Sequence, residues 1–253
     1  MATASPDLVL DIGNTRTKAA LFSLGRPVRH GFLSSSPDAL GSWLVAVRPN
    51  RIALACSGEV NAAFIAFLQR LAPVTRLTGQ SPSPLQSAYT TPATLGVDRS
   101  ANAVAAWAMF PKRASLSIDL GTCITYDVVD GSGTYCGGAI SPGLRMRAEA
   151  MHTYTARLPN VEVAAVPLLG TDTVGALQSG VFNGVLAEVH GYSKTLRQQW
   201  PDLAVVVTGG DAPLVLAGLG TRIFADPLLT LRGLHALLEH QHALGAGPTG
   251  AGR

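Results

Sequence analysis

The most constraining feature of this 253-residue chain is a short internal repeat. The segment Leu8–Thr17 is matched in outline, 108 positions later, by Leu116–Thr125. In each copy an aspartate, Asp11 or Asp119, ends an apolar strand, and a glycine follows two residues later. A strand–turn–strand unit that occurs twice can form two phosphate-binding turns on either side of a cleft. The repeat therefore predicts two similar α/β domains with a central cleft between them.

Strand-like and helix-like patterns alternate along both halves of the chain, which is typical of α/β domains. The expected strands cover residues 8–11, 18–23, 51–56, 74–77 and 204–208, with three more between 116 and 140. The expected helices cover residues 37–47, 60–72, 97–110, 144–158, 173–200 and 228–244, and another follows the turn at 209–211. Ser36 before Pro37 predicts an N-cap. We expect an N-terminal domain at 1–112, a C-terminal domain at 113–244 and a flexible tail at 245–253.

Composition excludes several classes of protein. Charged residues make up 14% of the chain and the mean hydropathy is +0.26, which is typical of a globular protein with a large core. The net charge of +3 is not clustered, so no nucleic-acid partner is expected. No apolar run reaches the length of a membrane span, and no secretory signal precedes Leu8. Cys56, Cys123 and Cys136 form no CxxC pair, which fits a reducing cytoplasm.

The first copy of the repeat offers a phosphate-binding turn. Gly13 allows close approach of the backbone to a phosphate, and Asn14, Thr15 and Thr17 add side-chain donors. Asp11 could hold Mg²⁺ through water, and Lys18 could add positive charge. The alternative is a plain β-hairpin with a Gly-Asn turn.

The second copy, Asp119–Thr122, is the matching turn. Thr122 can donate a hydrogen bond to a phosphate oxygen. Asp119 could bind a monovalent cation near the phosphates, or it could cap its own turn.

A candidate for the chemistry lies at Gly96–Arg99, where a long loop enters a helix. Asp98 could accept a proton from a substrate hydroxyl as that oxygen attacks a γ-phosphate, and Arg99 could bind a carboxylate through two parallel hydrogen bonds. The alternatives are a helix-capping aspartate and a surface Asp–Arg pair.

Tyr89 lies in the Pro-rich loop 79–94, where it could close over a substrate or simply pack. Either Thr171 or Thr173 is expected to cap the helix that follows.

Two glycine-rich segments precede helices, Gly137–Gly143 and Thr208–Asp211. Each could approach a nucleotide closely, or could be an ordinary connection. His235, His240 and His242 lie near one another in sequence, but no acid or cysteine beside them completes a metal set.

Taken together, the motifs resemble those of the type III pantothenate kinase family, over about residues 7–239. The matching motifs, in order, are Asp11-x-Gly-Asn-Thr, Tyr89, Gly96-x-Asp-Arg99, Asp119-x-Gly-Thr122, Gly137-Gly-x-Ile-x-Pro-Gly143, Thr173-x-x-Ala-x-Gln-Ser-Gly180 and Thr208-Gly-Gly-Asp211. Cys123 departs from the family, which usually has a small residue such as Ala there.

The resemblance implies two ribonuclease-H-like domains of the acetate and sugar kinase/heat-shock-70/actin superfold. It implies ATP-dependent phosphorylation of pantothenate, the first step of coenzyme A biosynthesis, by a cytoplasmic homodimer with Mg²⁺ and K⁺ or NH₄⁺ as cofactors. It implies that Asp98 is the catalytic base and that Asp119 holds the monovalent cation. The implied ATP-binding residues are Asp11, Ile12, Gly13, Asn14, Thr15, Arg16, Thr17, Lys18 and Thr122. The implied pantothenate-binding residues are Tyr89, Gly96, Val97, Asp98, Arg99 and Thr173.

Two alternatives remain within the same fold. One is an accessory regulator without catalysis, against which Asp11, Asp98, Arg99 and Asp119 all argue. The other is a kinase acting on a different small hydroxy acid.

Overall fold

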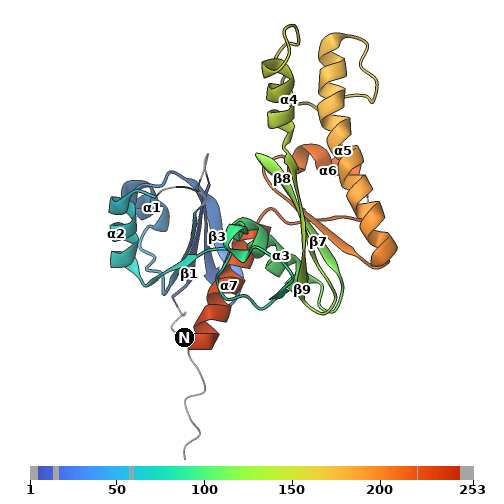
Figure 1. The fold of residues 1–253 in the computed structure, drawn as a ribbon. Helices are drawn as coiled ribbons and strands as arrows, with labels where there is room; N and C mark the ends of the chain where they lie inside the picture. The colour runs from blue at the N-terminus through green and yellow to red at the C-terminus, as the bar shows by residue number, and fades with distance from the viewer. Residues whose placement is uncertain (1–4, 14–16, 57, 59, 221, 246–253) are drawn as a thin grey trace, which may run out of the picture. The chain divides into compact units, whose positions relative to one another are not determined.

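The computed structural model describes residues 5–13, 17–56, 58, 60–220 and 222–245. Its contacts divide the chain into an N-terminal unit, residues 1–105 with 228–253, and a C-terminal unit, residues 106–227 (Figure 1). This division differs from the expected boundary between residues 112 and 113. It also assigns the last helix to the N-terminal unit, whereas we had expected it in the C-terminal domain.

The N-terminal unit is built on a sheet with the strand order β3-β2-β1-β4-β5. Its strands are β1 (Asp7–Ile12), β2 (Thr17–Ser23), β3 (Arg26–Leu33), β4 (Ile52–Cys56) and β5 (Val74–Leu77). The first three pair antiparallel, whereas β1, β4 and β5 run parallel. The edge strand β3 was not predicted, because its largely exposed residues show no apolar pattern.

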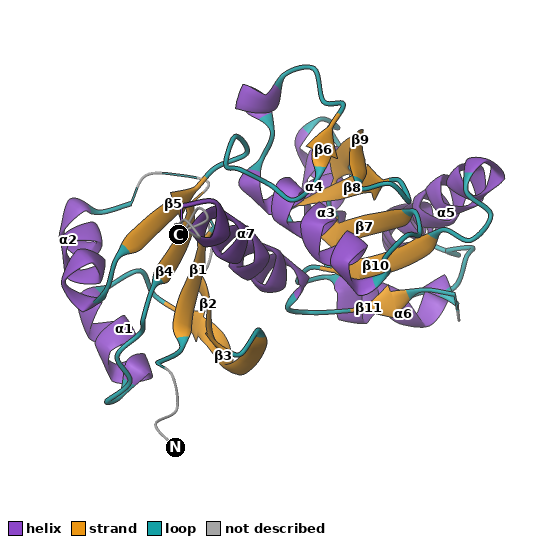
Figure 2. Cartoon of the chain, turned by 90° about the horizontal axis from the view of Figure 1, so that it is seen from below, coloured by secondary structure: helices purple, strands orange, loops and turns teal. Residues whose placement is uncertain are grey.

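Helices cover both faces of this sheet, as Figure 2 shows for α7 and for the α1–α2 pair. The helices are α1 (Pro37–Leu44), α2 (Ala62–Leu71), α7 (Leu229–Gly245) and α3 (Val97–Met109), of which residues 97–105 belong to this unit. Successive residues of β1 point to opposite faces. Leu8 and Leu10 pack in the cluster that includes α1 and α2, whereas Val9 packs in the cluster that includes α7. The buried leucines of α7 therefore complete the second face, which is why this helix belongs to the N-terminal unit.

The C-terminal unit repeats this plan. Its strands are β7 (Ser115–Leu120), β8 (Cys123–Val129), β9 (Thr134–Pro142), β10 (Ala204–Thr208) and β11 (Phe224–Ala225). They follow the order β9-β8-β7-β10-β11, with β7, β8 and β9 antiparallel and β7, β10 and β11 parallel. Strands β7 and β8 thus occupy the places that β1 and β2 hold in the first unit, which confirms the duplication predicted from the repeat.

Three helices complete the C-terminal unit: α4 (Leu144–Thr153), α5 (Thr173–Gln199) and α6 (Ala212–Leu219). Alternate residues of β7, Leu116, Ile118 and Leu120, belong to the core cluster that also contains buried residues of α5 and α6. Helix α4 ends at Thr153, short of the expected residue 158. Helix α5 is continuous over its 27 residues despite its internal glycines.

Caps explain where the helices begin and end. The predicted cap Ser36 is confirmed, since its side chain accepts a hydrogen bond from the amide of Ala39. Helix α1 ends earlier than expected because Val45 has a positive φ of 57°. The predicted threonine cap of α5 is wrong: Asp172 is the N-cap, and its carboxylate accepts a hydrogen bond of 2.8 Å from the amide of Gly175.

Among the described residues, no helix is long and apolar enough to cross a membrane.

Candidate active site

The first predicted phosphate turn connects β1 to β2. Asp11 is paired with Lys18 in the strand register, and their charged groups lie 3.8 Å apart. Thr17 is buried, and its hydroxyl lies 2.5 Å from the Ser35 hydroxyl. Gly13 is exposed. The candidate residues Asn14, Thr15 and Arg16 lie outside the described residues.

The second predicted turn connects β7 to β8 and is one residue shorter. Residues 121–123 separate the paired Leu120 and Ile124, whereas residues 13–16 separate the paired Ile12 and Thr17. Asp119 is half-buried at the end of its strand and Thr122 is exposed. The amide of Gly121 donates to the carbonyl of Cys123 at 3.1 Å, which closes the turn tightly.

Two glycines hold this second turn by direct backbone packing. A Cβ on Gly143 would lie 2.3 Å from the carbonyl oxygen of Gly121, and the Gly143 amide donates to the carbonyl of Thr122 at 3.1 Å. A Cβ on Gly209 would lie 2.4 Å from the carbonyl oxygen of Leu120, and Gly209 has a φ of +102°. Both glycine-rich segments of the sequence therefore pack their backbone against the second turn. At Gly143 and Gly209 this packing leaves no room for a Cβ atom.

The predicted catalytic segment begins α3. Asp98 is exposed in the first turn of the helix, whereas the next residue, Arg99, is only 5% exposed. The guanidinium carbon of Arg99 lies 5.8 Å from the ring centroid of Tyr89, which is half-buried. The two neighbours are thus not a surface ion pair: one carboxylate meets solvent, and one guanidinium is buried near an aromatic ring. Gly96 and Val97 precede them and are half-buried.

The remaining candidate, Thr173, is the exposed first residue of α5. Asp11, Lys18, Tyr89, Asp98 and Arg99 belong to the N-terminal unit, whereas Asp119, Thr122 and Thr173 belong to the C-terminal unit. Within the first unit, the structure brings Asp11 next to Lys18 and Tyr89 next to Arg99.

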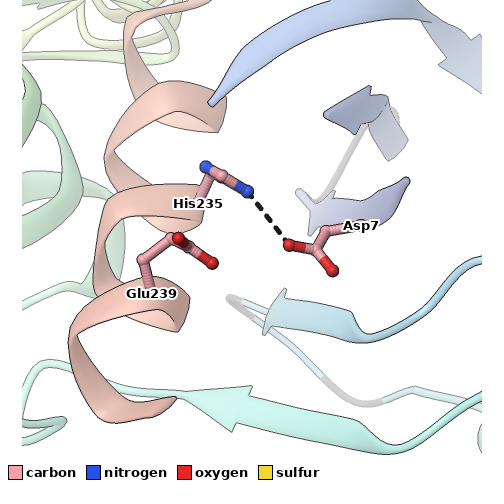
Figure 3. A group of neighbouring side chains, drawn as sticks. All are labelled: Asp7, His235 and Glu239. Carbon is pink, nitrogen blue, oxygen red and sulfur yellow. Dashed lines mark hydrogen bonds and ion pairs between the residues drawn. The ribbon is translucent and has the colours of Figure 1, made fainter. Parts of the chain in front are cut away.

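One cluster was missed by the sequence reasoning. Figure 3 shows His235 and Glu239 of α7 near Asp7, the first residue of β1. His235 Nε2 lies 3.2 Å from Asp7 Oδ2, and the imidazole stacks on Phe22 with ring centroids 4.3 Å apart. The sequence offered no complete ligand set around the histidines because Asp7, the third member of the cluster, lies 228 positions from His235 in the chain. Nothing in the local sequence could have predicted this contact.

Arg51 pairs with both carboxylates of this cluster. Its guanidinium donates to Asp7 through Nε at 3.0 Å and through a second nitrogen, and it also pairs with Glu239. Burial raises the pKa of Asp7, but hydrogen bonds from Arg51 and His235 outweigh it and leave this pKa below its ordinary value. Because Arg51 pairs with both carboxylates, we describe the cluster as an ion network that ties α7 to the sheet. A pocket of about 220 Å³ lies over it.

Comparison with solved structures identifies the fold. The chain resembles a glucokinase from an Antarctic psychrotroph with a TM-score of 0.50 and 14% identity, covering 93% of this chain and 99% of that one. It resembles a Campylobacter jejuni protein, named for the Baf family of transcriptional activators, with a TM-score of 0.62 and 20% identity, covering 93% and 98%. At these identities the likeness concerns the fold alone. The two matching sheets and their repeated strand–turn–strand units are those of the acetate and sugar kinase/heat-shock-70/actin superfold, with two ribonuclease-H-like domains.

Sequence comparison gives the family. Residues 7–195 match the family described as type III pantothenate kinase. A protein of Bacteroides fragilis with the name type III pantothenate kinase is 40% identical over 239 residues, which cover 93% of this chain and 98% of that protein. The chain belongs to the type III pantothenate kinase family, and the predicted resemblance is confirmed.

Proposed function

We propose that this chain transfers the γ-phosphoryl group of ATP to the primary hydroxyl of pantothenate, which gives 4'-phosphopantothenate in the first step of coenzyme A biosynthesis. The observation that carries the proposal is the family match, with 40% identity over nearly the whole chain. The position of Asp98 supports it, since an exposed carboxylate at the start of α3 is free to reach a bound substrate.

Asp98 is the general base in this proposal. Its carboxylate accepts the proton of the pantothenate hydroxyl while the hydroxyl oxygen attacks the γ-phosphorus. A new P–O bond forms to that oxygen, the bond from the γ-phosphorus to the β–γ bridging oxygen breaks, and ADP leaves with that electron pair. Arg99 and Tyr89, held near each other, bind the other end of the substrate together with Gly96, Val97 and Thr173, and Arg99 supplies the positive charge that a carboxylate needs.

The two turns bind the phosphates of ATP in this proposal, the first through Asp11–Lys18 and the second through Thr122. Each turn offers one carboxylate. The Asp11 side chain is 17% exposed and Asp119 is half-buried, so both are open enough to accept an ion with its water. A single carboxylate suits Mg²⁺ at Asp11, because Mg²⁺ keeps most of its hydration shell. Asp119 holds K⁺ or NH₄⁺, and these cations, when bound, offset the charge gathered at the phosphates.

The proposal also includes that the protein is a homodimer and lies in the cytoplasm. The three free thiols, Cys56, Cys123 and Cys136, support a reducing compartment. A dimer would elute with about twice the 26.2 kDa mass of the chain, which light scattering after size exclusion would measure.

The experiment is an ADP-release assay with ATP, in which pantothenate is compared with a panel of sugars and small hydroxy acids, with and without K⁺. Of the acceptors tested, we expect only pantothenate to support ADP release. K⁺ or NH₄⁺ should increase the rate, and ³¹P NMR should show a phosphomonoester product. Release with another hydroxy acid in place of pantothenate would instead support a related kinase. No release with any acceptor, in protein that still binds ATP, would support the accessory regulator.

A further inference from the structure

A second, half-buried network joins two helices of the C-terminal unit to its sheet. Glu188, on α5, accepts hydrogen bonds from the hydroxyls of Tyr126 on β8, at 2.8 Å, and Ser141 on β9, at 2.5 Å, both at Oε1. Its other oxygen pairs with Arg147 of α4. The Glu188 and Arg147 side chains are only 22% and 21% exposed, so water screens this pair weakly.

Arg147 extends the network to the end of β9. Its Nε donates to the carbonyl of Pro142 at 2.8 Å, and one of its terminal nitrogens lies 3.3 Å from the Ser141 hydroxyl. Two consecutive residues, Ser141 and Pro142, are thus held by the Arg147–Glu188 pair. A planar guanidinium with several fixed donors suits this task, because it can bind a carboxylate and a backbone carbonyl at once.

The residue after Pro142 is Gly143, which packs against the second turn. Its amide donates to Thr122, and its Cα approaches the Gly121 carbonyl too closely for any side chain. A shift of Ser141 and Pro142 would therefore pass through Gly143 to the backbone of residues 121 and 122.

We infer that Glu188 and Arg147 are positioning residues that fix the second phosphate turn, residues 119–122, through Ser141, Pro142 and Gly143. The inference rests on the proposed function in one respect, that this turn binds ATP. In this inference neither the Glu188 nor the Arg147 side chain touches the nucleotide. Both instead hold in place the turn that binds it.

The charge pattern fits a support rather than a binding group. Burial raises the pKa of Glu188, but hydrogen bonds from Arg147, Ser141 and Tyr126 outweigh it and bring this pKa below its ordinary value. The carboxylate is therefore ionised at neutral pH, and Arg147 cancels its charge. The pair adds no net negative charge beside a turn that must accept phosphates.

The test compares Ser141→Ala with Tyr126→Phe. Each variant removes one hydroxyl from the same oxygen of Glu188, but only Ser141 lies on the path to the turn. Glu188→Gln is the third variant; it keeps an oxygen for both hydroxyls and gives up the charge that holds Arg147. Steady-state kinetics, ADP binding by calorimetry and hydrogen exchange of the amide of Gly143 are measured on the full chain.

We expect Ser141→Ala and Glu188→Gln to raise the KM for ATP and the Kd for ADP by roughly tenfold. This is the lower end of the effect that loss of a residue supporting a binding site typically has on affinity. The kcat and the KM for pantothenate should stay near wild type, and the Gly143 amide should exchange faster. Tyr126→Phe should leave nucleotide affinity and Gly143 exchange unchanged. Equal effects of Ser141→Ala and Tyr126→Phe, or a lowered melting temperature with unchanged nucleotide affinity, would overturn the inference.

Failure of the proposed function looks different. Wild-type protein without pantothenate-dependent ADP release would contradict the proposed function, while ADP binding and Gly143 exchange would still decide the inference. If Glu188→Gln fails to fold, the Ser141→Ala and Tyr126→Phe pair is sufficient.

Discussion

The carboxylate of Asp98 occupies the space that a side chain at Gly96 would need. A Cβ on Gly96 would lie 2.4 Å from Asp98 Oδ1, closer than any normal contact. The spacing Gly-x-Asp at the start of α3 therefore has a physical reason: only glycine leaves this position open to the carboxylate that we propose as the base.

Gly96→Ala should reduce activity although Asp98 is still present. The added methyl group would push aside the short Asp98 side chain, which moves more easily than backbone, so stability should change little. A misplacement of about 1 Å can cost roughly a hundredfold in rate, and we expect a fall in kcat of that order. Gly41→Ala is the control, since its Cβ would make an ordinary 3.9 Å contact with Phe67. Normal kcat in Gly96→Ala would contradict this account.

Asp98→Asn should remove the proton acceptor. General base catalysis typically contributes about 10²- to 10⁴-fold, so kcat should fall within that range. The melting temperature should hardly change, because the side chain is exposed. Asp38→Asn is the matched control, an exposed acid in the first turn of α1. Near-normal turnover of Asp98→Asn would exclude this residue as the base.

Asp119→Asn should abolish the response to monovalent cations. In the proposed function Asp119 holds K⁺ or NH₄⁺, so wild-type activity should rise with either ion and the variant should give a flat titration at a low rate. Titration with NaCl at matched ionic strength controls for screening. A variant that still responds to K⁺ as wild type does would remove this role from Asp119.

Gly209→Ala should destabilise the protein whatever its function. The methyl group would meet the backbone of Leu120 at 2.4 Å, and the φ of +102° is unfavourable for alanine. Overpacking typically costs about 1–3 kcal/mol of unfolding free energy, which urea denaturation would measure. The neighbouring Gly210→Ala should be close to neutral, since no atom lies within 4 Å of its Cβ position. Similar losses in both variants would argue against the packing of Gly209 on the second turn.

His235 should make stability fall as the solution becomes acidic. Burial lowers the pKa of His235, and the hydrogen bond with Asp7 offsets only part of this effect. An unfolded histidine takes up a proton near pH 6.5, whereas folded His235 stays neutral to lower pH. Below about pH 6.5 the unfolded state therefore binds more protons, and the free energy of unfolding decreases as the pH falls.

His235→Gln should flatten the dependence of melting temperature on pH between about pH 7 and pH 5, since it removes this proton uptake. The exposed His242 of the same helix provides the control, and His242→Gln should keep the wild-type slope. The same slope in His235→Gln as in wild type would show that this imidazole does not titrate differently on folding.

The sequence predicted those features that depend on residues close together in the chain, namely strands, turns and some helix caps. The duplicated strand–turn–strand units were visible because strand alternation and turn glycines are local, and Ser36 was recognised as a cap for the same reason. The threonine cap of α5 was wrong because Asp172, between two candidate threonines, competes for the same amide. The aspartates at the ends of β1 and β7 were located correctly, whereas their proposed roles stay predictions.

Contacts between distant segments could not be predicted. Asp7 and His235 meet only because α7 returns to the first sheet, and Glu188 reaches Ser141 only because α5 packs beside β9. The exposed strand β3 belongs to the sheet through backbone pairing with β2, which leaves no apolar pattern in its sequence.

The return of α7 to the N-terminal sheet has a consequence for synthesis on the ribosome. Val9 and Phe22 emerge early, yet the leucines of α7 that cover them are among the last described residues to be made. The 106–227 unit is complete in sequence before that point and can fold first. The N-terminal sheet, although its strands are made before the 106–227 unit, is therefore expected to be completed only after α7 has emerged, with one side of the sheet open to chaperones until then.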